Sequence, residues 1–269
     1  MDIIAALILG LTQGITEWLP VSSTGHLVLL QGAMQIPAAE SVLFDIFLHI
    51  ATLFSVMIFL RKDLIKIIGS MFRKGDSLDS DGLKSRRIGW LAILATIPAV
   101  IAGLILSNYL EEVFTPMATA IALLFTGAML WIAEMPKLRK EKKEIGTKDA
   151  LIIGCFQAVA VVPGISRSGS TISAGCYLGF QRQIVAIFSF LLSIPIIIAA
   201  LAYNATSIGG AKMDWIATSA AAILAFVTGL LALKLLFGMI QKFKLRIFSI
   251  YCWAIGILVI GILLYQALS

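Results

Sequence analysis

The chain contains six apolar stretches that are each long enough to cross a lipid bilayer. At about 1.5 Å per residue, a helix of about 20 residues spans a hydrocarbon core of roughly 30 Å. The six stretches lie near residues 42–60, 88–108, 117–135, 184–203, 214–237 and 247–267. With 59% hydrophobic and 13% charged residues, the composition is far from that of soluble domains. We therefore predict an all-α integral membrane protein with a single membrane domain over residues 1–269.

The positive charge of the chain lies between these stretches. The formal net charge is +6, but the Lys and Arg residues have no aromatic residues interleaved that could stack on bases. We therefore expect no nucleic-acid partner. Short cytoplasmic loops of membrane proteins collect Lys and Arg, so bilayer lipids and topology explain the charge better.

The sequence also contains an internal repeat. An offset of 144 residues places Ala6 to Ile8 on Ala150 to Ile152, Gly10 on Gly154, Gln13 on Gln157 and Phe44 on Phe188. With one deletion, Pro20 falls on Pro163 and Ser23 on Ser166. The repeat predicts two halves, 1–135 and 149–269, joined by a basic cytoplasmic linker at 136–148. Each half begins with an interrupted segment, 1–35 or 149–182, and continues with three spans.

Loop charges predict how the chain is threaded through the bilayer. Segments 61–87, 137–148 and 238–246 are basic and are expected in the cytoplasm, whereas 109–116 and 204–213 are expected outside. The latter two contain Glu111, Glu112 and a single Lys212. Because each half has an odd number of spans, the second copy begins on the opposite side of the bilayer and has the inverted orientation. Both interrupted segments then become re-entrant helical hairpins, with their tips near the midplane and both termini outside.

The first tip runs from Gln13 to His26. Gln13 and Glu17 are four residues apart and share one helix face, and Pro20 with the following Ser/Thr run predicts a break and a capped returning helix. The N-terminus of that helix would seat a phosphate. His26 follows Ser22 and Ser23 by one turn, so we expect nucleophile, base and anion seat to converge.

The second tip runs from Pro163 to Thr171 and contains Arg167. A guanidinium at membrane depth needs an anionic partner or a wet cavity, and its planar fork matches the oxygens of a diphosphate. The alternative is that Glu17 simply pairs with Arg167 in a buried structural ion pair. In the repeat alignment Glu17 falls opposite Val161, so the first tip is predicted to supply acid and base and the second to hold phosphate.

Asp45 and His49 are also four residues apart, on a predicted span. They either line the same cavity or form a local hydrogen-bonded pair. The sequence leaves both alternatives open.

The segments L-P-V-S-S-T-G-H, Leu19 to His26, and P-G-x-S-R-S-x-x-T, Pro163 to Thr171, resemble the signatures of the undecaprenyl-diphosphate phosphatase family, also known as the bacitracin-resistance protein family. The resemblance covers essentially the whole chain. It implies hydrolysis of undecaprenyl diphosphate to undecaprenyl phosphate and inorganic phosphate at the outer face of the cell membrane, which recycles the carrier lipid for cell-wall polymers. It also implies that Mg²⁺ or Ca²⁺ stimulates the reaction, and it allows a homodimer.

The resemblance also assigns residues to roles. The catalytic set that it implies is Glu17, Ser23, His26 and Arg167, and it implies phosphate contacts for Ser166, Ser168 and Thr171. We expect four further residues of the two tips to bind the substrate, namely Gln13, Ser22, Thr24 and Gly164. Gln13 departs from the family, in which many members place a second glutamate there, and this leaves Glu17 as the lone base or metal contact. The attacking group stays open between Ser23, His26 and water, with Ser23 favoured.

A function of a different class is a polyprenyl-phosphate transporter or flippase. Inverted repeats with broken helices at the midplane are typical of secondary transporters. The cluster of Glu17, Ser23 and His26 argues for an enzyme, because ion coupling usually needs fewer reactive groups.

Overall fold

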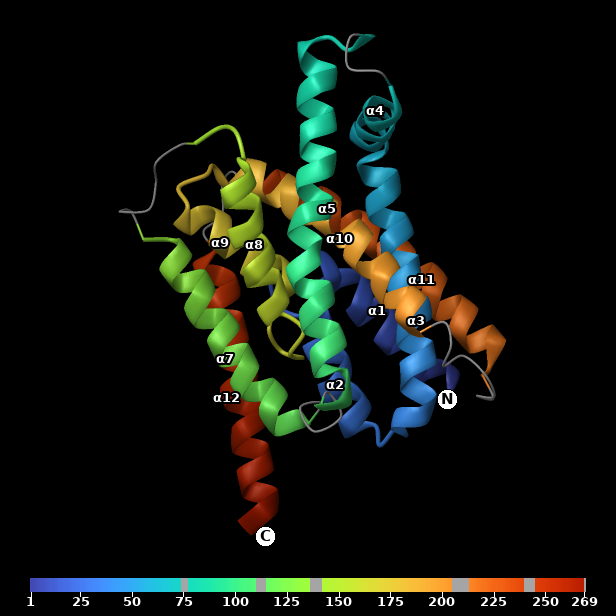
Figure 1. Cartoon of the computed structure of the whole chain (residues 1–269). Helices are drawn as coiled ribbons and strands as arrows, with labels where there is room; N and C mark the ends of the chain where they lie inside the picture. The colour runs from blue at the N-terminus through green and yellow to red at the C-terminus, as the bar shows by residue number, and fades with distance from the viewer. Residues whose placement is uncertain (74–76, 110–114, 136–141, 205–212, 240–244, 269) are drawn as a thin grey trace.

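A computed structural model describes residues 1–73, 77–109, 115–135, 142–204, 213–239 and 245–268 (Figure 1). Its regular elements in these ranges are helical, which confirms the all-α prediction. The helices are α1 (Ile3–Trp18), α2 (Ser23–Ala33), α3 (Ala38–Phe59), α4 (Arg61–Phe72), α5 (Ser80–Leu106), the short 3-10 helix η2 (Ser107–Tyr109), α7 (Pro116–Ala133), α8 (Thr147–Val159), α9 (Arg167–Tyr177), α10 (Arg182–Asn204), α11 (Trp215–Met239) and α12 (Arg246–Leu268).

Six helices in the described residues are long and apolar enough to cross a membrane, as predicted. They cover Ser41–Phe59, Ser80–Leu106, Pro116–Ala133, Arg182–Tyr203, Trp215–Gly238 and Arg246–Leu268. Helix α5 begins eight residues before the predicted start at residue 88, because the Asp79 side chain caps it by accepting from the Gly82 N–H at 2.8 Å. Figure 1 shows this end of α5 extending beyond α8 and α10.

Helix α4 lies within a segment that was expected only as a basic connection. Its buried face carries Ile67 and Ser70, and Ile67 and Met71 pack against Gly89 of α5. Basic side chains occupy the opposite side, and Lys66 pairs with Asp81 at 3.2 Å. The helical period of this segment is hard to recognise in the sequence, because charged residues interrupt its apolar positions.

Both interrupted segments form two helices separated by a short break. Residues 19–22 separate α1 from α2, and residues 160–166 separate α8 from α9. The side chains of Ser22 and Ser166 cap the returning helices by accepting from the N–H groups of Gly25 and Gly169 at 3.2 and 3.0 Å. The predicted breaks and caps are therefore confirmed.

Two glycines bring helices that are distant in the sequence into close contact. Helix α1 packs on α11, where a Cβ atom at Gly10 would collide with the carbonyl oxygen of Ala221. Helix α8 packs on α5, where a Cβ atom at Gly154 would collide with the carbonyl oxygen of Ala95. The first helix of each interrupted segment thus packs against one long helix, α11 for α1 and α5 for α8.

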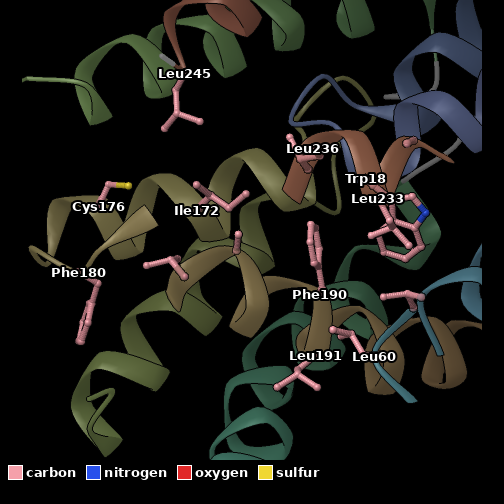
Figure 2. Close-up of a cluster of buried hydrophobic side chains, with 14 of the residues drawn as sticks. Trp18, Leu60, Ile172, Cys176, Phe180, Phe190, Leu191, Leu233, Leu236 and Leu245 are labelled. Carbon is pink, nitrogen blue, oxygen red and sulfur yellow. The ribbon is translucent and has the colours of Figure 1, made fainter. Parts of the chain in front are cut away.

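A buried apolar cluster supports the end of α1. Figure 2 shows Trp18 beside Leu233 of α11, with Phe190 of α10 close by. The rings of Trp18 and Phe190 meet edge to face at 5.8 Å, and the Trp18 indole N–H donates to Ser55 Oγ at 3.2 Å. Because Trp18 follows Glu17 directly, this packing fixes the backbone that carries the carboxylate.

The contact of α8 with α5 predicts a sensitive position. Gly154→Ala should lower the thermal midpoint of the protein in detergent, because the new methyl group meets backbone and overpacking costs about 1–3 kcal/mol. Gly103→Ala in α5 is the matched control, since nothing lies within 4 Å of its added Cβ atom. The control should keep or slightly raise the midpoint. An equal midpoint for both variants would contradict this packing.

Candidate active site

The two helix breaks lie against each other. The Ser168 hydroxyl of α9 donates to the carbonyl oxygen of Leu19 in the first break at 3.1 Å. A Cβ atom at Gly25 would lie 2.9 Å from the Cα atom of Gly164, which itself has a φ of +94°. Both positions therefore favour glycine, the first for close approach and the second for its backbone conformation.

Helix α7 holds the second break in place. The Thr126 hydroxyl donates to the carbonyl oxygen of Gly164 at 2.8 Å and accepts from the N–H of Ser166 at 3.1 Å. One side chain thus satisfies two backbone groups where the helix is interrupted. Buried backbone groups need such partners, so Thr126 stabilises the geometry of the break.

Glu17 accepts hydrogen bonds from three side chains. Its Oε1 accepts from Arg167 Nη2 at 2.6 Å, and its Oε2 accepts from Ser23 Oγ at 2.6 Å and from Gln13 Nε2 at 3.0 Å. The glutamate is only 7% exposed. The buried ion pair that the sequence left as an alternative is therefore present, and it also includes the hydroxyl of Ser23.

Arg167 is the first residue of α9 and faces the first break. Its guanidinium lies over the ring of Trp18, with Cζ 5.7 Å from the centroid, and Nη1 donates to the Ser189 carbonyl oxygen at 3.4 Å. The side chain is 16% exposed, against 5% for that of Glu17. Arg167 is thus held in one orientation beside the carboxylate.

The hydroxyl groups at the start of α9 are bonded within the protein. Ser166 Oγ lies 3.2 Å from Ser168 Oγ, and Thr171 Oγ1 lies 2.7 Å from Ser189 Oγ. Thr171 also donates to the Arg167 carbonyl oxygen at 2.9 Å. Thr24, at the start of α2, is half-buried. Of these groups, Thr171 is bonded directly to the backbone of Arg167, and Ser166 and Ser168 lie next to Arg167 in the chain.

His26 does not face Ser23 as the helix spacing suggested. Its Nδ1 lies 2.7 Å from the Ser22 carbonyl oxygen and its Nε2 lies 2.8 Å from the hydroxyl of Tyr251 on α12. Ser23 bonds to Glu17 instead. Tyr251 could not be predicted from the sequence, because 225 residues separate it from His26 and no motif surrounds it.

His49 joins the site from α3. Its Nε2 lies 3.9 Å from Glu17 Oε2, while its Nδ1 lies 2.7 Å from the Asp45 carbonyl oxygen. The Asp45 carboxylate accepts from Gln31 Nε2 at 2.8 Å. Of the two alternatives for this pair, His49 lines the site, whereas the Asp45 side chain bonds to α2.

Protein side chains alone do not form a metal-binding cluster in the part of the chain that the structure describes. No group of three or more His, Cys, Asp or Glu residues there is arranged to hold an ion. Gln13 Oε1 is buried and has no hydrogen-bond partner in this part of the chain, so one oxygen next to Glu17 is left to bind something else.

Fold and site together define a multi-pass membrane protein with a carboxylate, a hydroxyl, a guanidinium and two imidazoles around two helix breaks. The family model described as bacitracin resistance protein BacA matches residues 6–258. The chain belongs to this family.

Curated relatives cover nearly its full length. Proteins named undecaprenyl-diphosphatase from Methanobrevibacter smithii and Methanosphaera stadtmanae are 37% and 39% identical, over 96% and 97% of this chain and 97% and 98% of their own. A third, from Alkaliphilus metalliredigens, is 36% identical over 97% of this chain and 98% of its own. The resemblance seen in the two motifs is thereby confirmed.

The burial of the Glu17–Arg167 pair predicts strong thermodynamic coupling. Glu17→Gln and Arg167→Met should each lower the free energy of unfolding by about 3–5 kcal/mol, because each leaves a buried charge without its partner. The double variant should lose much less than the sum. Unfolding in detergent measures all three.

The exposed pair Lys66 and Asp81, with side chains 51% and 67% exposed, is the control for this cycle. Its cycle should give a coupling of at most about 1 kcal/mol. Strictly additive losses at Glu17 and Arg167 would show that the two charges do not stabilise each other.

Proposed function

We propose that this protein is an undecaprenyl-diphosphatase of the cell membrane, which hydrolyses undecaprenyl diphosphate to undecaprenyl phosphate and inorganic phosphate. This reaction would return the carrier lipid to cell-wall polymer synthesis, and it would confer bacitracin resistance. The observation that carries the proposal is the contact of Ser23 with Glu17 beside Arg167, in a chain whose full-length relatives are named for this activity.

Glu17 is the base and Ser23 the nucleophile in this proposal. Ser23 Oγ already donates to Glu17 Oε2 at 2.6 Å. When Arg167 turns from Glu17 to a phosphoryl oxygen, the carboxylate loses its strongest donor and becomes a better proton acceptor. Ser23 Oγ then attacks the terminal phosphorus, its proton passes to Glu17, and undecaprenyl phosphate leaves. Water hydrolyses the phosphoserine in a second step.

The remaining groups stabilise the transferring phosphoryl group. Arg167 offers a planar fork, and the N-termini of α2 and α9 point their free N–H groups toward the junction of the breaks. Such donors act where charge develops during phosphoryl transfer. Ser166, Ser168 and Thr171 would contact the diphosphate, and His26 and His49 supply proton donors or acceptors on either side.

A divalent cation fits this site only together with the substrate. Mg²⁺ and Ca²⁺ bind oxygen ligands, and Mg²⁺ is often held by one or two carboxylates plus substrate phosphates. Glu17 and the unpartnered Oε1 of Gln13 would hold the ion beside the diphosphate oxygens. The ion would neutralise negative charge on the diphosphate.

The inverted repeat and the re-entrant hairpins are also part of the proposal. The reciprocal contacts of Gly10 and Gly154 with α11 and α5 support a twofold relation between the halves. In Figure 1 the C-terminus of the chain and the C-terminal end of α5 lie at one side, and α4 lies at the other. This agrees with basic segments in the cytoplasm and both termini outside. The active site would open to the outer face.

Several loop charges used for this threading lie outside the described residues. They are Lys74, Glu111, Glu112, Lys137, Arg139, Lys140, Lys212, Lys242 and Lys244. The topology therefore rests on the sequence of these segments and on the helices that flank them.

Purified protein in detergent should release inorganic phosphate from undecaprenyl diphosphate. Arg167→Lys should lower kcat by about 10² to 10³, because a point charge replaces the planar fork that stabilises the transition state. Arg87→Lys, at an exposed position on α5, is the control and should keep wild-type turnover. Lipid transport in sealed vesicles without phosphate release would favour the flippase alternative instead.

The proposed topology is testable with a reporter enzyme that is active only outside the cytoplasm. Fusion after Ser269 should give an active reporter and fusion after Phe72 an inactive one, because α12 ends outside and α4 lies in the cytoplasm. Activity in whole cells is the measurement. An inactive fusion after Ser269, with normal protein level, would overturn the threading.

A further inference from the structure

The imidazole of His26 is fixed at both nitrogen atoms. Nδ1 lies 2.7 Å from the carbonyl oxygen of Ser22, and Nε2 lies 2.8 Å from the hydroxyl oxygen of Tyr251. A carbonyl oxygen only accepts hydrogen bonds, so Nδ1 carries a proton. When the ring is neutral, Nε2 carries the lone pair and accepts a hydrogen bond from the Tyr251 hydroxyl.

Tyr251 reaches His26 from the lipid-facing side of α12. It is 39% exposed, whereas His26 is 8% exposed. The two rings are nearly parallel, with an interplanar angle of 8° and centroids 5.6 Å apart. The next residue, Cys252, is fully buried and lies 4.0 Å from the Pro20 carbonyl oxygen, measured from Sγ. Helix α12 is thus anchored on the first break at the level where Tyr251 covers the imidazole.

His49 provides a comparison within the same site. Its Nδ1 is tied to the carbonyl oxygen of Asp45, four residues earlier, as His26 is tied to Ser22. Its Nε2 faces Glu17 at 3.9 Å. The backbone therefore selects the same protonated nitrogen in both rings, and Tyr251 gives His26 a different partner at Nε2.

We propose that Tyr251 is a positioning residue for His26. Its hydroxyl holds the ring in the Nδ1–H form, with Nε2 directed at one point of the site. The role in turnover rests on the proposed phosphatase function. The contact itself does not, so the two are separable by experiment.

The chain has two histidines, so histidine labelled with ¹⁵N gives signals from two rings only. Spectra of a His49→Gln variant assign the remaining ring to His26. The wild-type protein should show His26 protonated at Nδ1. Tyr251→Phe should shift the Nε2 signal of His26 and leave His49 unchanged. Tyr265→Phe, on the same helix and 74% exposed, should shift neither ring.

Kinetics test the role in turnover. Tyr251→Phe keeps the ring and removes one neutral hydrogen bond, so kcat should fall about threefold to tenfold while KM changes less than twofold. Tyr265→Phe should match the wild type. The split between kcat and KM separates positioning of His26 from substrate binding.

Three results would overturn the proposal. They are a wild-type His26 protonated only at Nε2, an unchanged His26 spectrum in Tyr251→Phe, or a change confined to KM. The wild-type spectrum alone decides the first, even when variants fold poorly. If the spectra behave as expected but wild-type protein releases no phosphate, the contact stands and the phosphatase function fails.

Discussion

The ion pair between Glu17 and Arg167 joins the two helix breaks on which the site depends. Glu17 lies in the last turn of α1 and Arg167 in the first turn of α9, and their atoms approach to 2.6 Å. An isolated charge of either sign would cost several kcal/mol at this degree of burial. Each side chain therefore offsets the desolvation cost of the other, and Ser23, Gln13 and Trp18 contact the pair.

This arrangement places reactive groups on a rigid frame rather than on loose loops. The breaks are closed by side chains of distant helices, with Thr126 of α7 at the second break and Cys252 of α12 at the first. Both histidines are oriented by carbonyl oxygens of their own helices. A site built in this way keeps its frame when an anion enters, and the main change in the proposed reaction is that Arg167 turns from Glu17 to a phosphoryl oxygen.

Local patterns in the sequence predicted the elements, whereas of the long-range contacts only the Glu17–Arg167 ion pair was anticipated, as an alternative. Six apolar stretches and two runs of Pro, Gly and Ser gave the spans, the breaks and the caps at Ser22 and Ser166, because each depends on neighbouring residues only. The spacing of His26 from Ser23 suggested a contact that the structure replaces with Tyr251. Helical spacing places residues on a face, but tertiary packing decides which partner that face meets. Helix α4 was not predicted, because its segment was interpreted from its charged residues and not from the spacing of its apolar ones.

The packing of α1 on α11, and of α8 on α5, affects the order in which the contacts can form during synthesis. Helix α1 needs α11, and Glu17 needs Arg167, which is synthesised 150 residues later. At about 5–20 residues per second, the carboxylate waits roughly 8–30 s for its partner. During that time the first half has an acidic group and no matching guanidinium, so water, the insertion machinery or a proton must stabilise Glu17 until the second half arrives.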